Sequence, residues 1–303
     1  MNTKNNNITS TNGWNQICHQ HLELCKIKVV LMMVVSAFCG MLLAYDNSFK
    51  WQTAVLAMIG IALSASSGGV INHILDQKID KQMSRTKNRP LASGNLKKNH
   101  VIIFAITLLV TGMSILWHYT NSITTYFTLG AVVGYGFVYT GVLKHLTPQN
   151  IVIGGINGAL PPLLGWLSIT GTITAAPLTM VLIIFAWTPP HFWALAIAKH
   201  DDYKKSQVPM LPVTNGIPYT KLYILLYTII MALCTILPVI IKLNSMIYLI
   251  AMTILNVKFL SMTIKLYHAN NNDLAMPIFK FSITYLMLFF AITLLDRLII
   301  MSM

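Results

Sequence analysis

Residues 51–80 read WQTAVLAMIGIALSASSGGVINHILDQKID, an apolar run that turns polar at Asn72. About 20 consecutive apolar residues suffice to cross a bilayer as a helix, so residues 51–71 predict a membrane span. Beyond it, Asn72, Asp76 and Asp80 follow one another at intervals of four residues. Because four residues are slightly more than one helical turn, the three side chains share one face of a continuing helix. The stretch therefore predicts a transmembrane helix that ends in an amide and two carboxylates.

This polar face offers the hard oxygen ligands that bind Mg²⁺, which usually takes one or two carboxylates, waters and oxygens of a substrate phosphate. Four cationic side chains suited to phosphate follow in the next turns and loop: Lys78, Arg85, Lys87 and Arg89. We therefore predict a site for a metal-bound diphosphate, with Asn72, Asp76 and Asp80 as metal ligands and catalytic residues. The alternative is a solvated helix end beside an ordinary basic loop. The helix dipole disfavours bare carboxylates at a C-terminal end, which favours the metal.

The composition is that of a membrane protein, with 55% hydrophobic residues, 10% charged residues and a mean hydropathy of +0.64. The net charge of +13 would suit nucleic acid in a soluble protein. Here the basic residues lie between apolar runs, so they indicate orientation in a lipid bilayer and no nucleic-acid partner. Lipid admits only helices or closed barrels, and the runs are too long for soluble strands. We predict an all-α protein with nine spans: 27–45, 51–71, 101–118, 122–142, 151–169, 176–197, 222–241, 245–264 and 278–300.

Lysine and arginine concentrate in alternate loops, above all in residues 72–100. The positive-inside rule places this loop and the amino terminus in the cytoplasm and the carboxyl terminus outside. Residues 1–25 are polar and rich in asparagine, which predicts a flexible cytoplasmic tail, and they lack a signal-peptide pattern. Residues 26–303 then form a single integral-membrane domain.

A second acidic segment follows the sixth predicted span, so that each half of the chain has one. Asp201 and Asp202 come at the end of this span, and Lys204 and Lys205 follow. Adjacent residues point about 100° apart on a helix. We therefore expect only one of the two aspartates to face a shared metal site, unless the helix has already ended.

The sixth span contains Pro189 and Pro190, which we expect to interrupt it. The break would turn His191 toward a cavity, where it would serve as a ligand or acid–base group for an acceptor substrate. The alternative is a core histidine bonded to a carbonyl. His73 lies at the predicted membrane edge, where a solvated role is expected, and the glycines of the fifth span predict close helix packing.

The polar motifs together resemble the UbiA superfamily of intramembrane aromatic prenyltransferases. The Asn72-x3-Asp76-x3-Asp80 motif marks the superfamily in general. Further motifs resemble its heme-farnesylating branch, the heme O synthases, and extend over most of the chain from about residue 25: Arg85-Thr86-Lys87-Asn88-Arg89-Pro90, Tyr139-Thr140 with Leu143-Lys144, residues 147–155, residues 189–195, Asp202-Tyr203 and residues 208–213.

The resemblance implies nine helices around a central cavity in a bacterial cytoplasmic (inner) membrane, with the active site facing the cytoplasm. It implies transfer of a farnesyl group from farnesyl diphosphate to a vinyl group of heme B, giving heme O, with Mg²⁺ as cofactor. A heme A synthase or a terminal oxidase assembly is a further candidate partner. Asp202 would join the metal ligands as a catalytic residue, although the usual second Asp-x3-Asp motif is missing because Ser206 stands at its second position. The remaining substrate contacts would come from Tyr139, Lys144, His191, Asp201 and Lys205.

Three other functions are compatible with parts of the pattern. Another UbiA-type enzyme, such as a hydroxybenzoate polyprenyltransferase, would share the first motif but not the Pro-Pro-His-Phe-Trp run at residues 189–193. A transporter would also have broken helices and polar groups inside the membrane, but it would not release diphosphate. A non-catalytic assembly factor for a terminal oxidase would tolerate alanine at Asp76.

Overall fold

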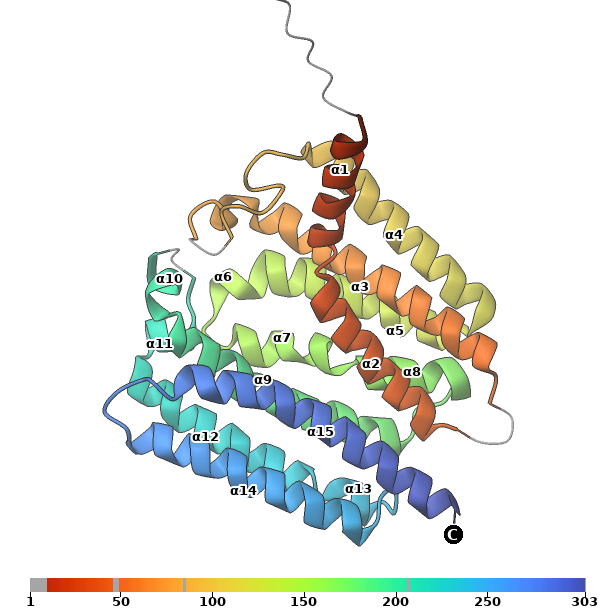
Figure 1. The fold of residues 1–303 in the computed structure, drawn as a ribbon, viewed down its shortest axis with the longest axis vertical. Coiled ribbons are helices and arrows are strands. Elements are labelled where there is room, and N and C mark those ends of the chain that lie inside the picture. Colours follow the sequence, from red (N-terminus) through yellow and green to blue (C-terminus); the bar gives the residue numbers. More distant parts are fainter. Residues whose placement is uncertain (1–9, 46–48, 84–85, 206–207, 303) are drawn as a thin grey trace, which may run out of the picture.

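A computed structural model describes residues 10–45, 49–83, 86–205 and 208–302, and within these ranges the chain forms helices and no strand (Figure 1). Eight helical segments are long and apolar enough to cross a membrane. They are α3 (Trp51–Asp80), α4 (Lys98–Tyr119), α5 with η1 (Ser122–Val133 and Gly134–Leu143), α7 with α8 (Asn150–Ala159 and Pro161–Thr170), α9 (Ala175–Ala198), α12 with α13 (Ile217–Cys234 and Leu237–Ile240), α14 (Met246–His268) and α15 (Ala275–Ser302). The predicted all-α membrane class is confirmed.

The first predicted span is α2 (Ile27–Leu43), which has 17 residues and follows α1 (Ser10–Leu24) at a bend of 54°. Counted with α1, it gives the ninth candidate crossing. Within the expected flexible tail, residues 10–24 are helical, and residues 1–9 lie outside the described part of the chain. The end of α1 is anchored, because Leu24 and Cys25 are buried in an apolar cluster with Val70 and Leu91. Burial of those side chains offsets the conformational entropy lost by ordering α1.

The helices pack in a closed ring around the centre of the molecule. Along this ring α3 packs on η1, η1 on α7, α7 on α9, α9 on α15, α15 on α2, and α2 again on α3. The polar ends of α3 and α9 lie at the same edge as the short helices α6 (Lys144–Leu146), α10 (His200–Lys205) and α11 (Leu211–Thr214) (Figure 1). This arrangement brings the polar motifs of both halves to one side.

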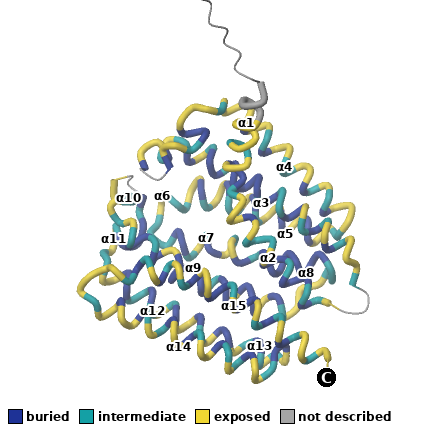
Figure 2. Tube along the Cα trace, in the orientation of Figure 1, coloured by how far each residue is buried: buried dark blue, intermediate teal, exposed yellow. Residues whose placement is uncertain are grey.

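The outward faces of the peripheral helices are apolar. Figure 2 shows exposed residues along α4, α12 and α14. On α4 and α14 many of these are large hydrophobic residues: Ile103, Ile106, Val110, Ile247, Ile250 and Ile254. A helix that is apolar on every side is typical of a membrane span. The protein is therefore an integral, multi-pass membrane protein.

One predicted helix continues as expected, and another differs from the structure. Helix α3 runs past Ile71 to Asp80, as the spacing of its polar residues predicted, and Asn72, Asp76 and Asp80 all lie on its buried side. Helix α9 runs through Pro189 and Pro190 without the predicted interruption. Pro189 and Pro190 are both buried among neighbouring helices, and such packing tolerates prolines in a membrane helix.

Candidate active site

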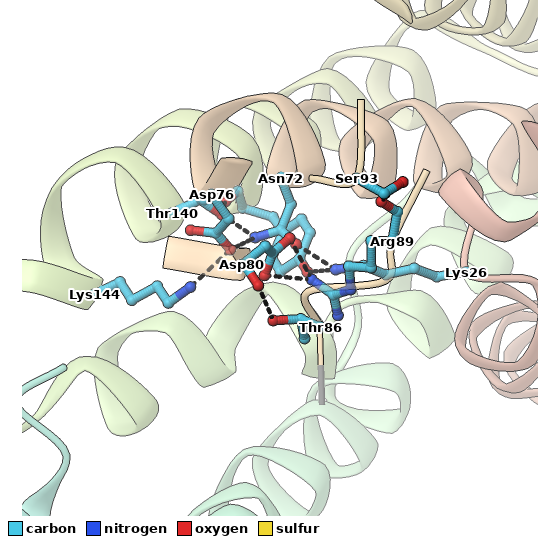
Figure 3. Close-up of polar contacts among 10 residues, drawn as sticks. Lys26, Asn72, Asp76, Asp80, Thr86, Arg89, Ser93, Thr140 and Lys144 are labelled. Carbon is cyan, nitrogen blue, oxygen red and sulfur yellow. Dashed lines mark hydrogen bonds and ion pairs between the residues drawn. The ribbon is translucent and has the colours of Figure 1, made fainter. Parts of the chain in front are cut away.

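The last three turns of α3 supply the acidic side of a cavity at the edge of the ring. Asn72, Asp76 and Asp80 are only 5%, 3% and 3% exposed, and all three side chains line this cavity (Figure 3). Their common direction follows from the spacing of four residues on a continuous helix. The sequence therefore predicted correctly that this face is shared.

Asp76 occupies the middle of the acidic face and has one unused oxygen. Its Oδ2 accepts from Lys144 Nζ at 2.7 Å and from Asn72 Nδ2 at 2.8 Å. Its Oδ1 is buried and has no hydrogen-bond partner among the residues that the structure describes. A buried carboxylate oxygen without a partner is costly. The orphaned oxygen therefore points to a bound cation or donor at this place.

Asp80 is held by the loop that follows α3. Arg89 Nη1 donates to both Asp80 Oδ1 and Oδ2 at 2.8 Å. Thr86 Oγ1 donates to the backbone oxygen of Asp80 at 3.0 Å, which satisfies a carbonyl left open at the helix end. Ser93 Oγ in turn donates to the backbone oxygen of Arg89 at 2.9 Å. The basic loop thus folds back over the acidic helix end and fixes a guanidinium beside it.

The opposite wall of the cavity comes from η1, a π-helical stretch. Thr140 Oγ1 donates to the carbonyl of Tyr135, five residues earlier, at 2.9 Å, and accepts from Asn72 Nδ2 at 3.1 Å. The rings of Tyr135 and Tyr139 stack with centroids 5.8 Å apart, and both line the cavity. A π-helical turn widens the backbone and is frequent at functional sites. Here it places two tyrosines one above the other and leads directly into Lys144.

Close packing on α7 fixes the Tyr139 ring. A Cβ atom at Gly154 would lie 2.2 Å from Tyr139 Cδ2, so only glycine leaves room for the ring. The remaining lining residues include the apolar side chains of Ile151, Phe192, Val208 and Met210. The cavity volume is about 170 Å³, below the roughly 300–1,000 Å³ of ordinary ligand pockets.

The structure thus assembles six of the predicted site residues in one cavity: Asn72, Asp76, Asp80, Arg89, Tyr139 and Lys144. Sequence reasoning missed Lys26, Thr86, Tyr135 and Tyr203, which also line it. Lys26 donates to Asn72 Oδ1 and, at 3.3 Å, to the Tyr135 hydroxyl. It lies 46 residues from Asn72 in the sequence, so no local pattern connects the two.

Other predicted substrate contacts lie elsewhere. Lys78, Lys87 and Lys205 are exposed and do not line the cavity. Arg85 lies outside the described residues. Asp201 and Asp202 line a separate, more open cavity at the end of α9, where the Asp201 side chain is 89% exposed and pairs with His200. The structure therefore does not bring this second acidic pair into the first site.

Two histidines differ from the sequence interpretation. His191 is buried, stacks against Trp187 and Phe279, and Nδ1 bonds to Ser282 Oγ at 2.6 Å, so it sits in the core and not in the cavity. His73 was expected to be solvated but is only 2% exposed, and neither ring nitrogen has a described partner. It lies one turn after Val70, whose apolar cluster extends over this side of α3.

A divalent cation fits the donor set of the cavity. The described residues contain no cluster of three His, Cys, Asp or Glu side chains that would enclose a metal by itself. Mg²⁺ does not need one, because it takes one or two carboxylates and completes its shell with water and phosphate oxygens. Asp76 Oδ1 is an unpartnered ligand atom of this kind. Lys144 and Arg89 also line the cavity, and their side chains are hydrogen-bond donors of the kind that binds phosphate oxygens.

Comparison with known proteins shows the family to which the chain belongs. Residues 33–292 match the model of the UbiA prenyltransferase family. The chain belongs to the UbiA prenyltransferase family. This UbiA protein is 48% identical over 289 residues to a protein from Hahella chejuensis named protoheme IX farnesyltransferase, covering 95% of each chain. It is 45% identical over 295 residues to a protein of the same name from Stutzerimonas stutzeri, covering 97% of this chain and 99% of that one.

Solved structures support the same fold for this UbiA protein. A structure described as digeranylgeranylglyceryl phosphate synthase superposes with a TM-score of 0.79 at 20% identity, over 92% of this chain and 98% of the other. A UbiA homologue from Archaeoglobus fulgidus, solved with DMAPP and Mg²⁺, superposes with a TM-score of 0.62 at 16% identity, over 90% of this chain and 99% of the other. At this identity the likeness concerns the fold. The resemblance predicted from the motifs is confirmed.

Proposed function

We propose that the protein transfers the farnesyl group of farnesyl diphosphate to a vinyl group of heme B and so makes heme O. One observation carries the choice of acceptor, namely the similarity of 45–48% over nearly the full length to proteins named protoheme IX farnesyltransferase. The cavity supports the diphosphate half of the reaction, because it combines two buried carboxylates with three cationic side chains.

The farnesyl diphosphate head fits among Lys144, Arg89 and the acidic face of α3. Breaking the bond between the farnesyl carbon and the diphosphate oxygen sends the electron pair to the diphosphate. Fixed cations in a site with little water stabilise the charge that develops there. Asn72, Asp76 and Asp80 would hold Mg²⁺, which when bound neutralises diphosphate oxygens and improves the leaving group. Asp202 lines a separate cavity and would act on the bound Mg²⁺ only through its charge, at longer range.

The farnesyl cation then needs an electron-rich partner and protection from water. Tyr135, Tyr139 and Phe192 line the cavity and exclude bulk water with their rings. The π electrons of the heme vinyl group form the new carbon–carbon bond, and the resulting cation takes up one water and releases a proton. The product is a hydroxyethylfarnesyl heme. Atoms balance as farnesyl diphosphate, heme B and water giving heme O and diphosphate.

We infer that the protein lies in a bacterial cytoplasmic membrane with its active site facing the cytoplasm, its amino terminus inside and its carboxyl terminus outside. The support is the excess of Lys and Arg in the loop after α3, at the same edge as the cavity. Both substrates would then enter from the inner leaflet or the cytoplasm.

The test is to incubate the purified full-length protein in lipid nanodiscs with farnesyl diphosphate, Mg²⁺ and heme B, and to analyse the extracted pigment by chromatography and mass spectrometry. We expect a more hydrophobic heme that has gained one farnesyl group and one hydroxyl group. A parallel reaction with 4-hydroxybenzoate is the control for acceptor choice. Prenylated hydroxybenzoate with unchanged heme B would overturn the proposed acceptor and leave only the family activity.

A further inference from the structure

Lys26 is held in an unusual backbone conformation at the bend between α1 and α2. Its φ and ψ are 54° and 48°, in the left-handed region, where a residue with a Cβ atom is strained. Strained residues of this kind persist only where the surroundings fix them, and they cluster at functional sites. The surroundings are visible here, because Leu24 and Cys25 immediately before it are buried.

The bend packs against α3 at Gly69. A Cβ atom at Gly69 would lie 3.4 Å from the carbonyl oxygens of both Leu24 and Cys25, an ordinary van der Waals distance. The backbone of the bend therefore lies against α3 about one turn before Asn72. The consequence is that the Lys26 side chain reaches the cavity from the amino-terminal part of the chain.

The Lys26 ammonium contacts the polar end of the site directly (Figure 3). Nζ donates to Asn72 Oδ1 and lies 3.3 Å from the Tyr135 hydroxyl, while the Asn72 amide nitrogen donates to Asp76 and Thr140. The two ends of the Asn72 amide are thus assigned, with oxygen toward Lys26. That oxygen is the atom through which Asn72 would bind a metal.

A metal ion and an ammonium group at one amide oxygen repel each other. A diphosphate removes the conflict, because its oxygens attract both cations. We propose that Lys26 is a further diphosphate-binding residue, which holds the Asn72 oxygen in the free protein and moves to phosphate oxygens when metal and diphosphate bind together. This inference rests on the proposed diphosphate chemistry of the same cavity.

Removing the charge of Lys26 should weaken the binding of pyrophosphate and strengthen the binding of a metal ion alone. A purely structural role of Lys26 would not change these two affinities in opposite directions. Lys26→Gln keeps a hydrogen-bond donor for Asn72 and loses the positive charge. It should bind pyrophosphate in the presence of Mg²⁺ about tenfold to a hundredfold more weakly, the value of one charge-assisted hydrogen bond. It should bind Mn²⁺ alone more tightly, because a competing cation has gone.

Titration of the purified full-length protein in detergent tests this, with Mn²⁺ followed by electron paramagnetic resonance and pyrophosphate by calorimetry. Lys28→Gln is the matched control, because Lys28 is exposed two residues further on and does not line the cavity. Lys26→Arg keeps the charge and should retain pyrophosphate binding. Thermal unfolding of each variant shows that the fold is intact.

Wild-type affinity for pyrophosphate in Lys26→Gln would overturn the proposal, and so would weaker binding of Mn²⁺ alone. A wild-type protein that binds no pyrophosphate would also overturn it. The assay contains no heme, so it is independent of the acceptor. If the wild type binds pyrophosphate but makes no heme O, the proposed acceptor fails and the assignment of Lys26 is still decided by the variants.

Discussion

Replacing Asp76 by alanine separates the role of this carboxylate in the fold from its role in the reaction. Asp76 Oδ2 and Lys144 Nζ are 2.7 Å apart, and their side chains are only 4% and 14% exposed. Removing one partner of a buried ion pair costs about 3–5 kcal/mol, because the remaining charge stays buried without a counterion. Lys144 retains some access to solvent, so we expect Asp76→Ala to lower the free energy of unfolding by about 3 kcal/mol.

The double variant Asp76→Ala/Lys144→Ala also removes the Lys144 charge that would lack a counterion, and it should regain most of that stability. Its activity should stay low. Loss of a metal-ligating carboxylate lowers the stabilisation of the transition state by several kcal/mol. A loss of about 3 kcal/mol already slows the reaction by about 10²-fold. Thermal unfolding and the rate of heme O formation are measured side by side, with the exposed Asp273→Ala as control. A double variant whose activity recovers together with its stability would refute a role for Asp76 in the reaction.

Three further predictions concern other parts of the molecule. Gly154→Ala should reduce activity, because its Cβ would lie 2.2 Å from the Tyr139 ring. Gly158→Ala on the same helix has no neighbour within 4 Å and should be neutral or stabilising, so equal activity of the two variants in kinetic assays would contradict the prediction. Asp202→Asn should reduce the response to Mg²⁺ more than Asp201→Asn, since a carboxylate that is 89% exposed contributes little; magnesium titrations with equal losses would show that both act. Reporter fusions should place the amino terminus inside and the carboxyl terminus outside, and two reporters on one side would require another number of spans.

The acidic face of α3 was predictable because its information is local. A spacing of four residues fixes a common direction on any continuous helix, so Asn72, Asp76 and Asp80 could be grouped without a structure. Arg89 followed for the same reason, since its loop directly continues α3. The apolar runs likewise predicted nine spans, because the thickness of a bilayer sets the length of a span, and the described residues contain eight candidate crossings, or nine when α1 and α2 count as one.

Contacts between distant segments were not predictable in the same way. The sequence could not place Lys26 beside Asn72, because their contact depends on a bend that packs against α3 at Gly69. The burial of His73 depends on an apolar cluster built from α1, α3 and α4 and from the loop around Leu91. No spacing of apolar residues in the sequence marks η1 as a π-helix, so the stacking of Tyr135 on Tyr139 could not be inferred. In each case tertiary packing decided the outcome.

The charges of the cavity explain why its ligands should bind together. Of the described side chains that line it, Lys26, Arg89 and Lys144 are cationic and Asp76 and Asp80 are anionic, a balance of 3 − 2 = +1. A divalent cation alone would raise this to +3 in a partly buried site, which is electrostatically unfavourable. A prenyl diphosphate carries up to about three negative charges and would restore neutrality. The ion pairs of Asp76 and Asp80 with Lys144 and Arg89 compensate the carboxylates in the free protein, so the balance of charge favours binding of metal and diphosphate as one complex.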